Sequence, residues 1–403
     1  MRVLFAQNMI HVPAHGGANK ANRILAELLA AQGHECHLVA PLTGALRTGT
    51  GDAADQLARH GVPGWERDDD ALVYHLGGVQ VHAVPEPARL VRRIRTVAAR
   101  LRPDWIVVPS DDPAGMVLAA ALAAAPGRVI YLAYTIQQLP CGPASFQPSP
   151  ARTAALRRTA GVLAISHAIR DYLAQWAEVE SELLYPPVYG PVPRIRPSGP
   201  ESGAVTLINP CGYKGLPVFL GLADTFPAAR FLAVPTWGTT AEDRAALHRR
   251  PNVEVTDPAD DIERILRSTR ILLVPSLWDE TFGFSCVDAM LRGIPVLASA
   301  VGGLPEAKLG VPYLLPVRRI ERYDVTADPA RPVPLVPDQN LDPWRAALSR
   351  LLDDPAHFDD IAQRSRNAAV NFVASLDRHA LAGYLLSRTP LQADPVGADG
   401  TAR

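Results

Sequence analysis

Short apolar runs alternate with segments of helical periodicity from the first residues of the chain. The run Arg2–Gln7 is followed by a segment in which Leu25 and Leu29 recur at a spacing of four, and then by the run Cys36–Ala40. Runs that are apolar throughout are typical of strands buried on both faces of a parallel sheet, whereas spacings of three and four indicate a helix with one buried face. The pattern therefore predicts a strand, a helix and a second strand.

The same alternation continues to about residue 177. The predicted strands are Val79–Val84, Trp105–Pro109, Val129–Tyr134 and Val162–Ser166, and the predicted helices are Leu90–Leu101, Ala114–Ala125 and a segment that ends at about Ala177. Two segments interrupt the alternation: Gly44–Asp70 is polar and glycine-rich, and Thr135–Pro150 is rich in proline and glycine. We expect both to be loops, because these residues punctuate regular structure.

A proline-rich segment then separates two α/β repeats. Pro186–Gly203 contains six prolines and few core residues, which is typical of an extended linker. Beyond it, strands are predicted at Ala204–Asn209, Arg230–Pro235, Asn252–Thr256, Arg270–Pro275, Pro295–Ser299 and Pro312–Leu315, and helices at Trp344–Leu352 and Ile361–Leu386. Arg319–Asp342 is a proline-rich excursion without a predicted role. We expect a first domain over residues 1–188, a linker over 189–203, a second domain over 204–370, a helix over 371–388 and a disordered tail over 389–403.

The stretch Val274–Glu306 is the strongest candidate for chemistry. A buried strand ends at Pro275, and the next residues, Leu277–Phe284, contain charged residues, aromatic residues and a glycine. Helical spacing begins at Ser285 and ends at Gly293. Open α/β sheets bind ligands at the carboxyl ends of their strands, and the predicted loop lies at such an end.

Two carboxylates and a helix start define this candidate site. The backbone N–H groups of Phe282, Gly283 and Phe284 open the predicted helix, which makes an anion site suited to a phosphate or to sugar hydroxyls. Glu280 lies in the loop and Asp288 about one turn inside the helix, so the two cannot share a helix face. We expect them to contact different parts of one ligand.

This spacing resembles that of the retaining glycosyltransferases of the GT-B fold, family 4. Members of that family carry a glutamate, seven residues and a second glutamate, and this chain has the same spacing with Asp288 in the second position. The matching residues are Pro275, Ser276, Glu280, Phe282, Gly283, Ala289, Met290, Gly293, Pro295, Val296, Ser299, Gly302, Gly303 and Glu306. A solvated loop carboxylate is the alternative for Glu280 alone, and the matching surroundings argue against it.

The resemblance implies an α/β protein of the GT-B fold, with two Rossmann-like domains facing across a cleft and a C-terminal helix that crosses back to the first domain. It implies retaining transfer from a nucleotide-diphosphate sugar, bound by the second domain, to a small-molecule acceptor, bound by the first. We expect neither a cofactor nor a metal, because a lysine and a helix dipole would stabilise the leaving diphosphate.

The resemblance also assigns roles to individual residues. Glu280 would hold hydroxyls of the donor sugar and Lys214 would contact the diphosphate, so these two are the predicted catalytic residues. The predicted donor-binding residues are Gly16, Gly17, Asn209, Gly215, Trp237, Phe282, Gly283, Phe284 and Asp288. The predicted acceptor-binding residues are Lys20, Tyr134 and Thr135.

Three positions depart from the family pattern. Asn209 stands where the family has an arginine, Tyr134 where many members have a histidine, and Asp288 where the family has its second glutamate. An impaired homologue that acts as a binding or partner protein therefore stays an alternative. A nucleotide-sugar epimerase of the same architecture is a second alternative, which would need additional catalytic acids. The sequences of the Thr135–Pro150 loop and of the turn before Gly215 suggest natural product biosynthesis.

Composition limits the classes of partner and the cellular compartment that we expect for this protein. The formal net charge of −1 gives no electrostatic attraction to nucleic acid. The four cysteines lack metal-site spacing and predict reduced thiols in a cytoplasmic protein. The longest apolar run, Met116–Ala125, is too short to span a bilayer, so no integral membrane segment is expected. The adjacent carboxylates of Asp111 and Asp112 are predicted to cap the end of a strand, and the oligomeric state stays open.

Overall fold

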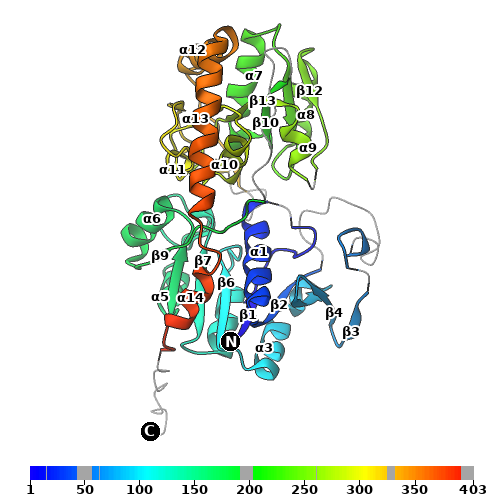
Figure 1. Ribbon diagram of the computed structural model, residues 1–403. Coiled ribbons are helices and arrows are strands. Elements are labelled where there is room, and N and C mark those ends of the chain that lie inside the picture. Colours follow the sequence, from blue (N-terminus) through cyan, green and yellow to red (C-terminus); the bar gives the residue numbers. More distant parts are fainter. Residues whose placement is uncertain are drawn as a thin grey trace. The chain divides into compact units, whose positions relative to one another are not determined.

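The computed structural model describes residues 1–14, 16–42, 57–62, 64–190, 203–259, 261–324 and 332–391 (Figure 1). The chain divides into two compact units. Unit 1 comprises Met1–Ile165, Arg170–Pro187 and Asp377–Arg403, and unit 2 comprises Ser166–Ile169 and Val188–Leu376. Each unit is built on one mainly parallel β-sheet, as the fully apolar runs predict.

Unit 1 contains a nine-stranded sheet in the order β3-β4-β5-β2-β1-β6-β7-β8-β9. Its strands are β1 (Arg2–Ala6), β2 (Glu35–Pro41), β3 (Glu66–Asp68), β4 (Ala71–Leu76), β5 (Val79–Val84), β6 (Trp105–Pro109), β7 (Val129–Ala133), β8 (Gly161–Ala164) and β9 (Glu182–Leu183). The pairs β3·β4 and β4·β5 are antiparallel, and the other pairs are parallel. All strands predicted in this part of the chain are confirmed to within two residues.

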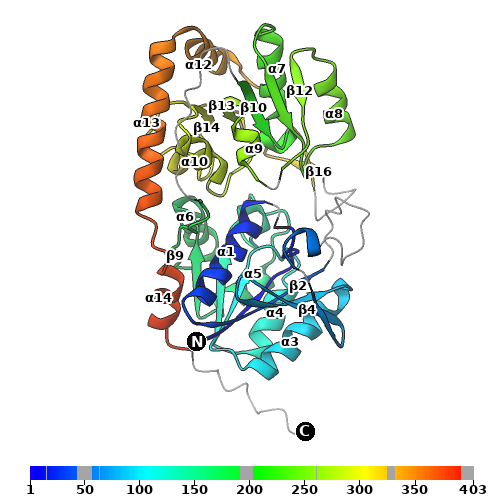
Figure 2. The same cartoon turned by 45° about the vertical axis from the view of Figure 1, so that its right-hand side comes forward.

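Helices cover this sheet on both faces. The unit 1 helices are α1 (Gly17–Ala31), α3 (Leu90–Leu101), α4 (Met116–Ala124), α5 (Pro150–Arg157), α14 (Ala380–Ser387) and, from Arg170 onward, α6 (His167–Ala177). Helix α1 buries Leu25 and Leu29 and contacts α14, whereas α3 packs against α4 (Figure 2). Trp105 in the central strand β6 donates its indole N–H to Leu385 O at 2.9 Å, which ties the end of the chain to unit 1.

The prediction of a loop over Gly44–Asp70 is wrong at its end. Residues 43–56 and 63 lie outside the described residues, and Glu66–Asp68 form β3. The buried guanidinium of Arg93 holds this strand, because it contacts the carboxylates of Asp68 at 2.6 Å and Asp70 at 3.7 Å. A contact from a helix more than twenty residues away is not readable from local polarity.

Unit 2 contains a six-stranded parallel sheet in the order β12-β11-β10-β13-β14-β15. Its strands are β10 (Ala204–Ile208), β11 (Phe231–Val234), β12 (Val253–Val255), β13 (Thr269–Val274), β14 (Val296–Ser299) and β15 (Leu314–Leu315). Its helices are α7 (Leu216–Thr225), α8 (Ala241–His248), α9 (Glu263–Leu266), α10 (Phe284–Leu291), α11 (Leu304–Ala307), α12 (Asp342–Asp353) and α13 (Pro355–Ala374). Helix α13 packs along α10 and α12 (Figures 1 and 2). The six predicted strands are confirmed.

The last predicted helix needs a correction. Ile361–Leu386 was predicted to be helical throughout, but α13 ends at Ala374 and α14 begins at Ala380. The carboxylate of Asp377 accepts the N–H of His379 at 2.8 Å, a contact that favours a turn over a continued helix. The excursion Arg319–Asp342 is not wholly irregular, because β16 (Tyr323–Asp324) and β17 (Val333–Pro334) form an antiparallel ribbon. Most of the predicted linker and tail, residues 191–202 and 392–403, lies outside the described residues.

The two arginines that contact Asp68 provide a test of this packing. The side chain of Arg93 is 1% exposed and that of Arg100 is 63% exposed, although both guanidinium groups reach the same carboxylate. Arg93→Met removes the buried cation that Asp68 and Asp70 share, although Arg100 still contacts Asp68 and Arg92 still contacts Asp70, so it should lower the free energy of unfolding by about 1.5–3 kcal/mol. Arg100→Met should cost less than about 1 kcal/mol. Urea denaturation measures both, and equal losses would show that Arg93 is no more important than a surface arginine.

Candidate donor site in unit 2

The strand order of unit 2 reverses between β10 and β13. From β10 the chain proceeds outward through β11 and β12, and from β13 it proceeds in the other direction through β14 and β15. The carboxyl ends of β10 and β13 therefore diverge into separate loops, and ligands of open α/β sheets bind at such a switch point. The loop after β10 carries Lys214 and the loop after β13 carries Glu280, so the two predicted catalytic residues lie at this position.

The structure brings these two side chains into direct contact. Lys214 Nζ donates to Glu280 Oε1 in a short ion pair. The side chains are 20% and 13% exposed, so the pair is largely withdrawn from water. Sixty-six residues separate them in the chain. The parallel pairing of β10 with β13 places them side by side.

Glu280 is held in one orientation by three donors. Besides Lys214, the hydroxyl of Ser276 and the indole N–H of Trp278, at 3.1 Å, donate to Oε1. Burial favours the neutral acid, but Lys214 and the two neutral donors outweigh it and lower the pKa of Glu280. The carboxylate is thus ionised, and Oε2 is the oxygen without a hydrogen bond to any described residue.

Two glycine positions let the backbones of these loops meet. Gly215 has φ +77°, and a Cβ there would lie 1.9 Å from Pro275 O. Gly302 and Gly303 form a glycine pair before α11. A Cβ on Gly302 would lie 2.3 Å from Glu280 O, and Gly303 N donates to Glu280 O at 2.7 Å. These glycines therefore let the Lys214 loop approach Pro275 and let the Gly302–Gly303 segment approach the backbone of Glu280.

Helix α10 begins beside Glu280, as predicted. Gly283 is its N-cap residue, with φ +116°, and Phe284 is its first residue. The ring of Phe282 is 1% exposed and stacks on Phe372 of α13 with centroids 5.8 Å apart. The start of the helix is consequently fixed by aromatic packing, which keeps its N–H groups in place for an anion.

Two other predicted donor residues make contacts that the sequence did not indicate. The carboxylate of Asp288 lies 3.7 Å from Arg292 in the next turn of α10 and is 13% exposed. Asn209 has φ +61° and is 4% exposed, and its Oδ1 accepts the N–H of Gly238 at 3.0 Å. Asn209 therefore fixes the loop that carries Trp237.

The predicted residues of unit 1 lie at the carboxyl edge of its sheet. Gly16 and Gly17 are exposed at the start of α1, and Lys20 donates its backbone N–H to Gly16 O at 3.1 Å. Thr135 donates its backbone N–H to Ser110 Oγ at 3.2 Å. Tyr134 is 1% exposed, and its hydroxyl has no hydrogen-bond partner among the described residues.

The acidic pair after β6 holds a neighbouring loop and the start of a helix, whereas the sequence predicted a cap at the end of a strand. Asp111 accepts the backbone N–H groups of Asn8 at 3.3 Å and Met9 at 2.9 Å, which anchors the loop after β1. Burial raises the pKa of Asp111 to about 7. Asp112 accepts the N–H of Val117 at 2.6 Å and so caps α4.

Several residues at the carboxyl ends of β1, β10 and β13 were not predicted from the sequence. His11 is 1% exposed with neither ring nitrogen hydrogen-bonded within the described chain, and burial lowers its pKa to about 3. Ser276 and Trp278 stand within the matched stretch, yet nothing local shows that they donate to Glu280. Tyr213 precedes Lys214 and its ring lies 4.9 Å from that of Trp278. Aromatic residues beside the two charged residues were the available signal.

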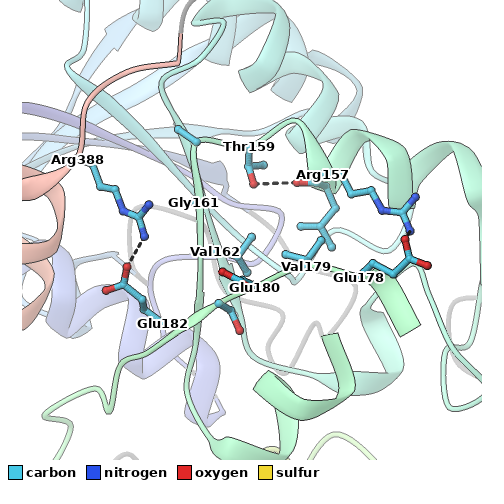
Figure 3. A pocket seen from close by; sticks show the side chains of 12 residues that line it. Arg157, Thr159, Gly161, Val162, Glu178, Val179, Glu180, Glu182 and Arg388 are labelled. Atoms are coloured by element: carbon cyan, nitrogen blue, oxygen red, sulfur yellow. Dashed lines mark hydrogen bonds and ion pairs between the residues drawn. The ribbon is translucent and has the colours of Figure 1, made fainter. Parts of the chain in front are cut away.

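A cavity of about 460 Å³ lies elsewhere, in unit 1 (Figure 3). It opens at the amino ends of β8 and β9, whereas the predicted residues of unit 1 lie at the carboxyl edge of the sheet. Its arginines form ion pairs, Arg157 with Glu178 at 3.5 Å and Arg388 with Glu182 (Figure 3). We therefore place the candidate site by the switch points and not by this cavity.

Three further observations bear on the chemistry. All four cysteines are free and buried. Within the described ranges, no group of three or more His, Cys, Asp and Glu side chains is placed to hold a metal ion. None of the described helices combines the length and apolar character needed to cross a membrane.

Comparison with known sequence families gives two matches along the chain. Residues 16–185 match the glycosyl transferase 4-like domain, and residues 218–324 match glycosyl transferases group 1. A D-inositol 3-phosphate glycosyltransferase of Mycobacterium sp. (strain KMS) is 35% identical over 81 residues, which is 20% of this chain and 18% of the relative. The chain thus matches less than a fifth of that relative's length.

Comparison with solved structures covers nearly the whole chain. Sucrose-phosphate synthase from Thermosynechococcus elongatus aligns with a TM-score of 0.67 and 17% identity over 95% of this chain and 97% of its own. HepE from Anabaena, in complex with UDP and glucose, aligns with a TM-score of 0.64 and 18% identity over 96% of this chain and 100% of its own. At such identities the likeness establishes the fold.

Gly215 and Gly310 offer a matched test of the close backbone contact. Both have φ near +76°, but a Cβ at Gly310 meets nothing within 4 Å, whereas one at Gly215 collides with Pro275 O. Gly310→Ala should cost about 1 kcal/mol for the left-handed conformation alone. Gly215→Ala should cost more, because the Lys214 loop must also move away from β13. Denaturation midpoints measure the difference, and equal costs would contradict the close approach.

Proposed function

We propose that this chain, which belongs to the glycosyltransferases of the GT-B fold, transfers a sugar from a nucleotide-diphosphate sugar to a small-molecule acceptor with retention of configuration. The observation that carries the proposal is the ion pair of Lys214 and Glu280 at the strand-order reversal of unit 2. It joins a cation suited to a diphosphate with a carboxylate suited to sugar hydroxyls, beside the start of α10. No isolated loop lysine or surface carboxylate would combine these features.

Lys214 would act on the leaving group. An ammonium carries three N–H donors, and Glu280 takes one of them, so the others can reach diphosphate oxygens without loss of the ion pair. Negative charge on the diphosphate grows as the glycosidic bond breaks. The contacts of Lys214 and of the helix start at Gly283 and Phe284 with the diphosphate would therefore be stronger in the transition state than in the complex with the intact donor.

Glu280 would orient the donor sugar. Its Oε1 is occupied by Lys214, Ser276 and Trp278, so Oε2 would accept hydroxyl groups of the sugar. The lowered pKa keeps this acceptor ionised at neutral pH. Asp288, on the first turns of α10, would accept hydroxyls of the ribose.

The acceptor would lie at the carboxyl edge of unit 1, near Lys20. Thr135 lies on the loop after β7 and would contribute to the same region. Tyr134 is 1% exposed, so its buried ring would support this region by packing and not by direct contact with the acceptor. The relative named for D-inositol 3-phosphate makes a polyol one reasonable acceptor to test, alongside natural products.

A ligand screen followed by product analysis tests the proposal. Thermal unfolding is recorded with UDP, GDP, dTDP and their sugars, because a ligand that binds only the folded state raises the midpoint. The conjugate that binds is then incubated with candidate acceptors, and the anomeric configuration of the product is read by NMR. A β-linked product from an α-linked donor would refute retention. Conversion of the donor to an epimer without an acceptor would favour an epimerase.

Lys214→Ala should weaken binding of the nucleoside diphosphate by about 1.5–3 kcal/mol, the range for a hydrogen bond to a charged group. Titration calorimetry measures the loss. Lys20→Ala removes a lysine that we place at the acceptor, so it should leave diphosphate affinity unchanged. An unchanged affinity in Lys214→Ala would remove this residue from the donor site.

Glu280→Gln should lower turnover more than donor affinity, because the carboxylate is assigned to the reacting sugar and not to the nucleotide. Its ionised form also stabilises the fold above the usual carboxyl pKa range, and this contribution is lost as pH falls through the lowered pKa. The variant should therefore lose the matching part of the pH dependence of unfolding. Glu254→Gln, at an exposed carboxylate on β12, serves as the control. Equal losses in turnover and affinity would restrict Glu280 to binding.

A further inference from the structure

Four aromatic side chains gather beside the ion pair of unit 2. Tyr213 is central, with ring centroids 4.9 Å from Trp278, 6.0 Å from Tyr323 and 6.2 Å from Trp237. Trp237 and Trp278 are 6.1 Å apart. We call these four residues the aromatic cluster. They come from the loops after β10, β11 and β13 and from the ribbon strand β16, so only the fold brings them together.

The cluster is continuous with the two predicted catalytic residues. The indole N–H of Trp278 donates to Glu280 Oε1 at 3.1 Å, and Lys214 Nζ lies 5.0 Å from the centroid of the Trp278 ring. Lys214 and Glu280, the two residues that we propose bind the donor, therefore also fix the position of the Trp278 ring. A ligand group held by Glu280 would lie next to the cluster.

The β16·β17 ribbon holds the cluster in place. Tyr323 stacks on Tyr213 with an interplanar angle of 23°, and the Tyr213 hydroxyl donates to Pro332 O. The N–H of Ile320 donates to Leu277 O at 2.8 Å, and Arg319 lies 3.0 Å from Asp279. The excursion thus packs on the loops that carry Lys214 and Glu280. Rings fixed before ligand binding lose little conformational freedom when a ligand arrives.

Trp237 is the member of the cluster with a free face. Its side chain is 42% exposed, whereas Tyr213 is 9% exposed. The loop that carries Trp237 is nevertheless fixed, because Gly238 N donates to Asn209 Oδ1 and a Cβ on Gly238 would lie 2.8 Å from Cys211 Sγ. A large apolar ring held rigidly in water beside two charged groups is typical of a binding surface.

We propose that the exposed face of Trp237 packs against the C–H face of the donor's pyranose ring. The inference rests on the proposed function. A pyranose presents hydroxyls at its edge and C–H groups on its faces, so a carboxylate and an adjacent aromatic ring recognise complementary parts of it. The link through Trp278 to Glu280, the carboxylate assigned to the sugar, favours the sugar over the nucleobase as the stacked group.

The test compares each nucleoside diphosphate with its sugar conjugate. The pair is chosen from UDP, GDP and dTDP and their glucose conjugates by the thermal screen, and affinities are measured by titration calorimetry. Trp237→Leu should weaken binding of the conjugate about three- to tenfold and leave the diphosphate unchanged. Trp237→Phe keeps an aromatic face and should recover most of the affinity. Trp176→Leu, at a tryptophan of α6 that is 43% exposed, is the matched control and should change neither.

The other outcomes separate the possible errors. Equal weakening of diphosphate and conjugate would place the nucleobase, not the sugar, on Trp237 and overturn the inference. Unchanged affinities in Trp237→Leu, with Lys214→Ala still impaired, would overturn it while the proposed function stands. Failure of the wild type to bind any of these compounds would overturn the proposed function itself. Circular dichroism of each variant shows that the loss is not one of folding.

Discussion

The buried contact of Lys214 with Glu280 is the constraint on which the rest of unit 2 depends. Withdrawing two charges from water is costly, and the attraction between them offsets that cost only with good geometry and further hydrogen bonds. The structure supplies those bonds from Ser276 and Trp278. It supplies the geometry through two adjacent parallel strands, whose ends hold the loops at one separation.

Glycines make that geometry sterically accessible. Gly215 lets the lysine loop approach β13, and Gly302 with Gly303 lets a third loop support the backbone of Glu280. A side chain at any of these positions would meet backbone atoms, which cannot move aside as a flexible side chain could. These glycines therefore stand where two backbone segments come into contact. The positions of Lys214 and Glu280 depend on those contacts.

At the carboxyl edge of its sheet, unit 1 has a buried carboxyl group that holds a loop. Its strand order reverses between β1 and β6, and there the carboxylate of Asp111 holds the loop after β1 by accepting backbone N–H groups. The nearby His11 and Tyr134 are buried, and burial lowers the pKa of the first and raises that of the second. Both are thus uncharged at neutral pH. His11 and Tyr134 therefore contribute buried neutral groups to this edge, whereas unit 2 has a largely buried ion pair at its own.

The sequence by itself determined the central strands of both sheets, most helices and the two α/β repeats. Short apolar runs rich in β-branched and aromatic residues, such as Trp105–Pro109 and Val129–Ala133, are typical of central strands, so local pattern was sufficient. It also identified Lys214 and Glu280 through the residues around them. It did not determine β3, because that strand is held by Arg93, or the break after Ala374, because helical periodicity continues through it. Only the tertiary structure decided that Lys214 and Glu280 touch, that Asn209 holds the Trp237 loop and that four aromatic rings meet. These contacts join loops from different strands, and strand order, which brings the loops together, is a property of the whole sheet and not of any stretch of sequence.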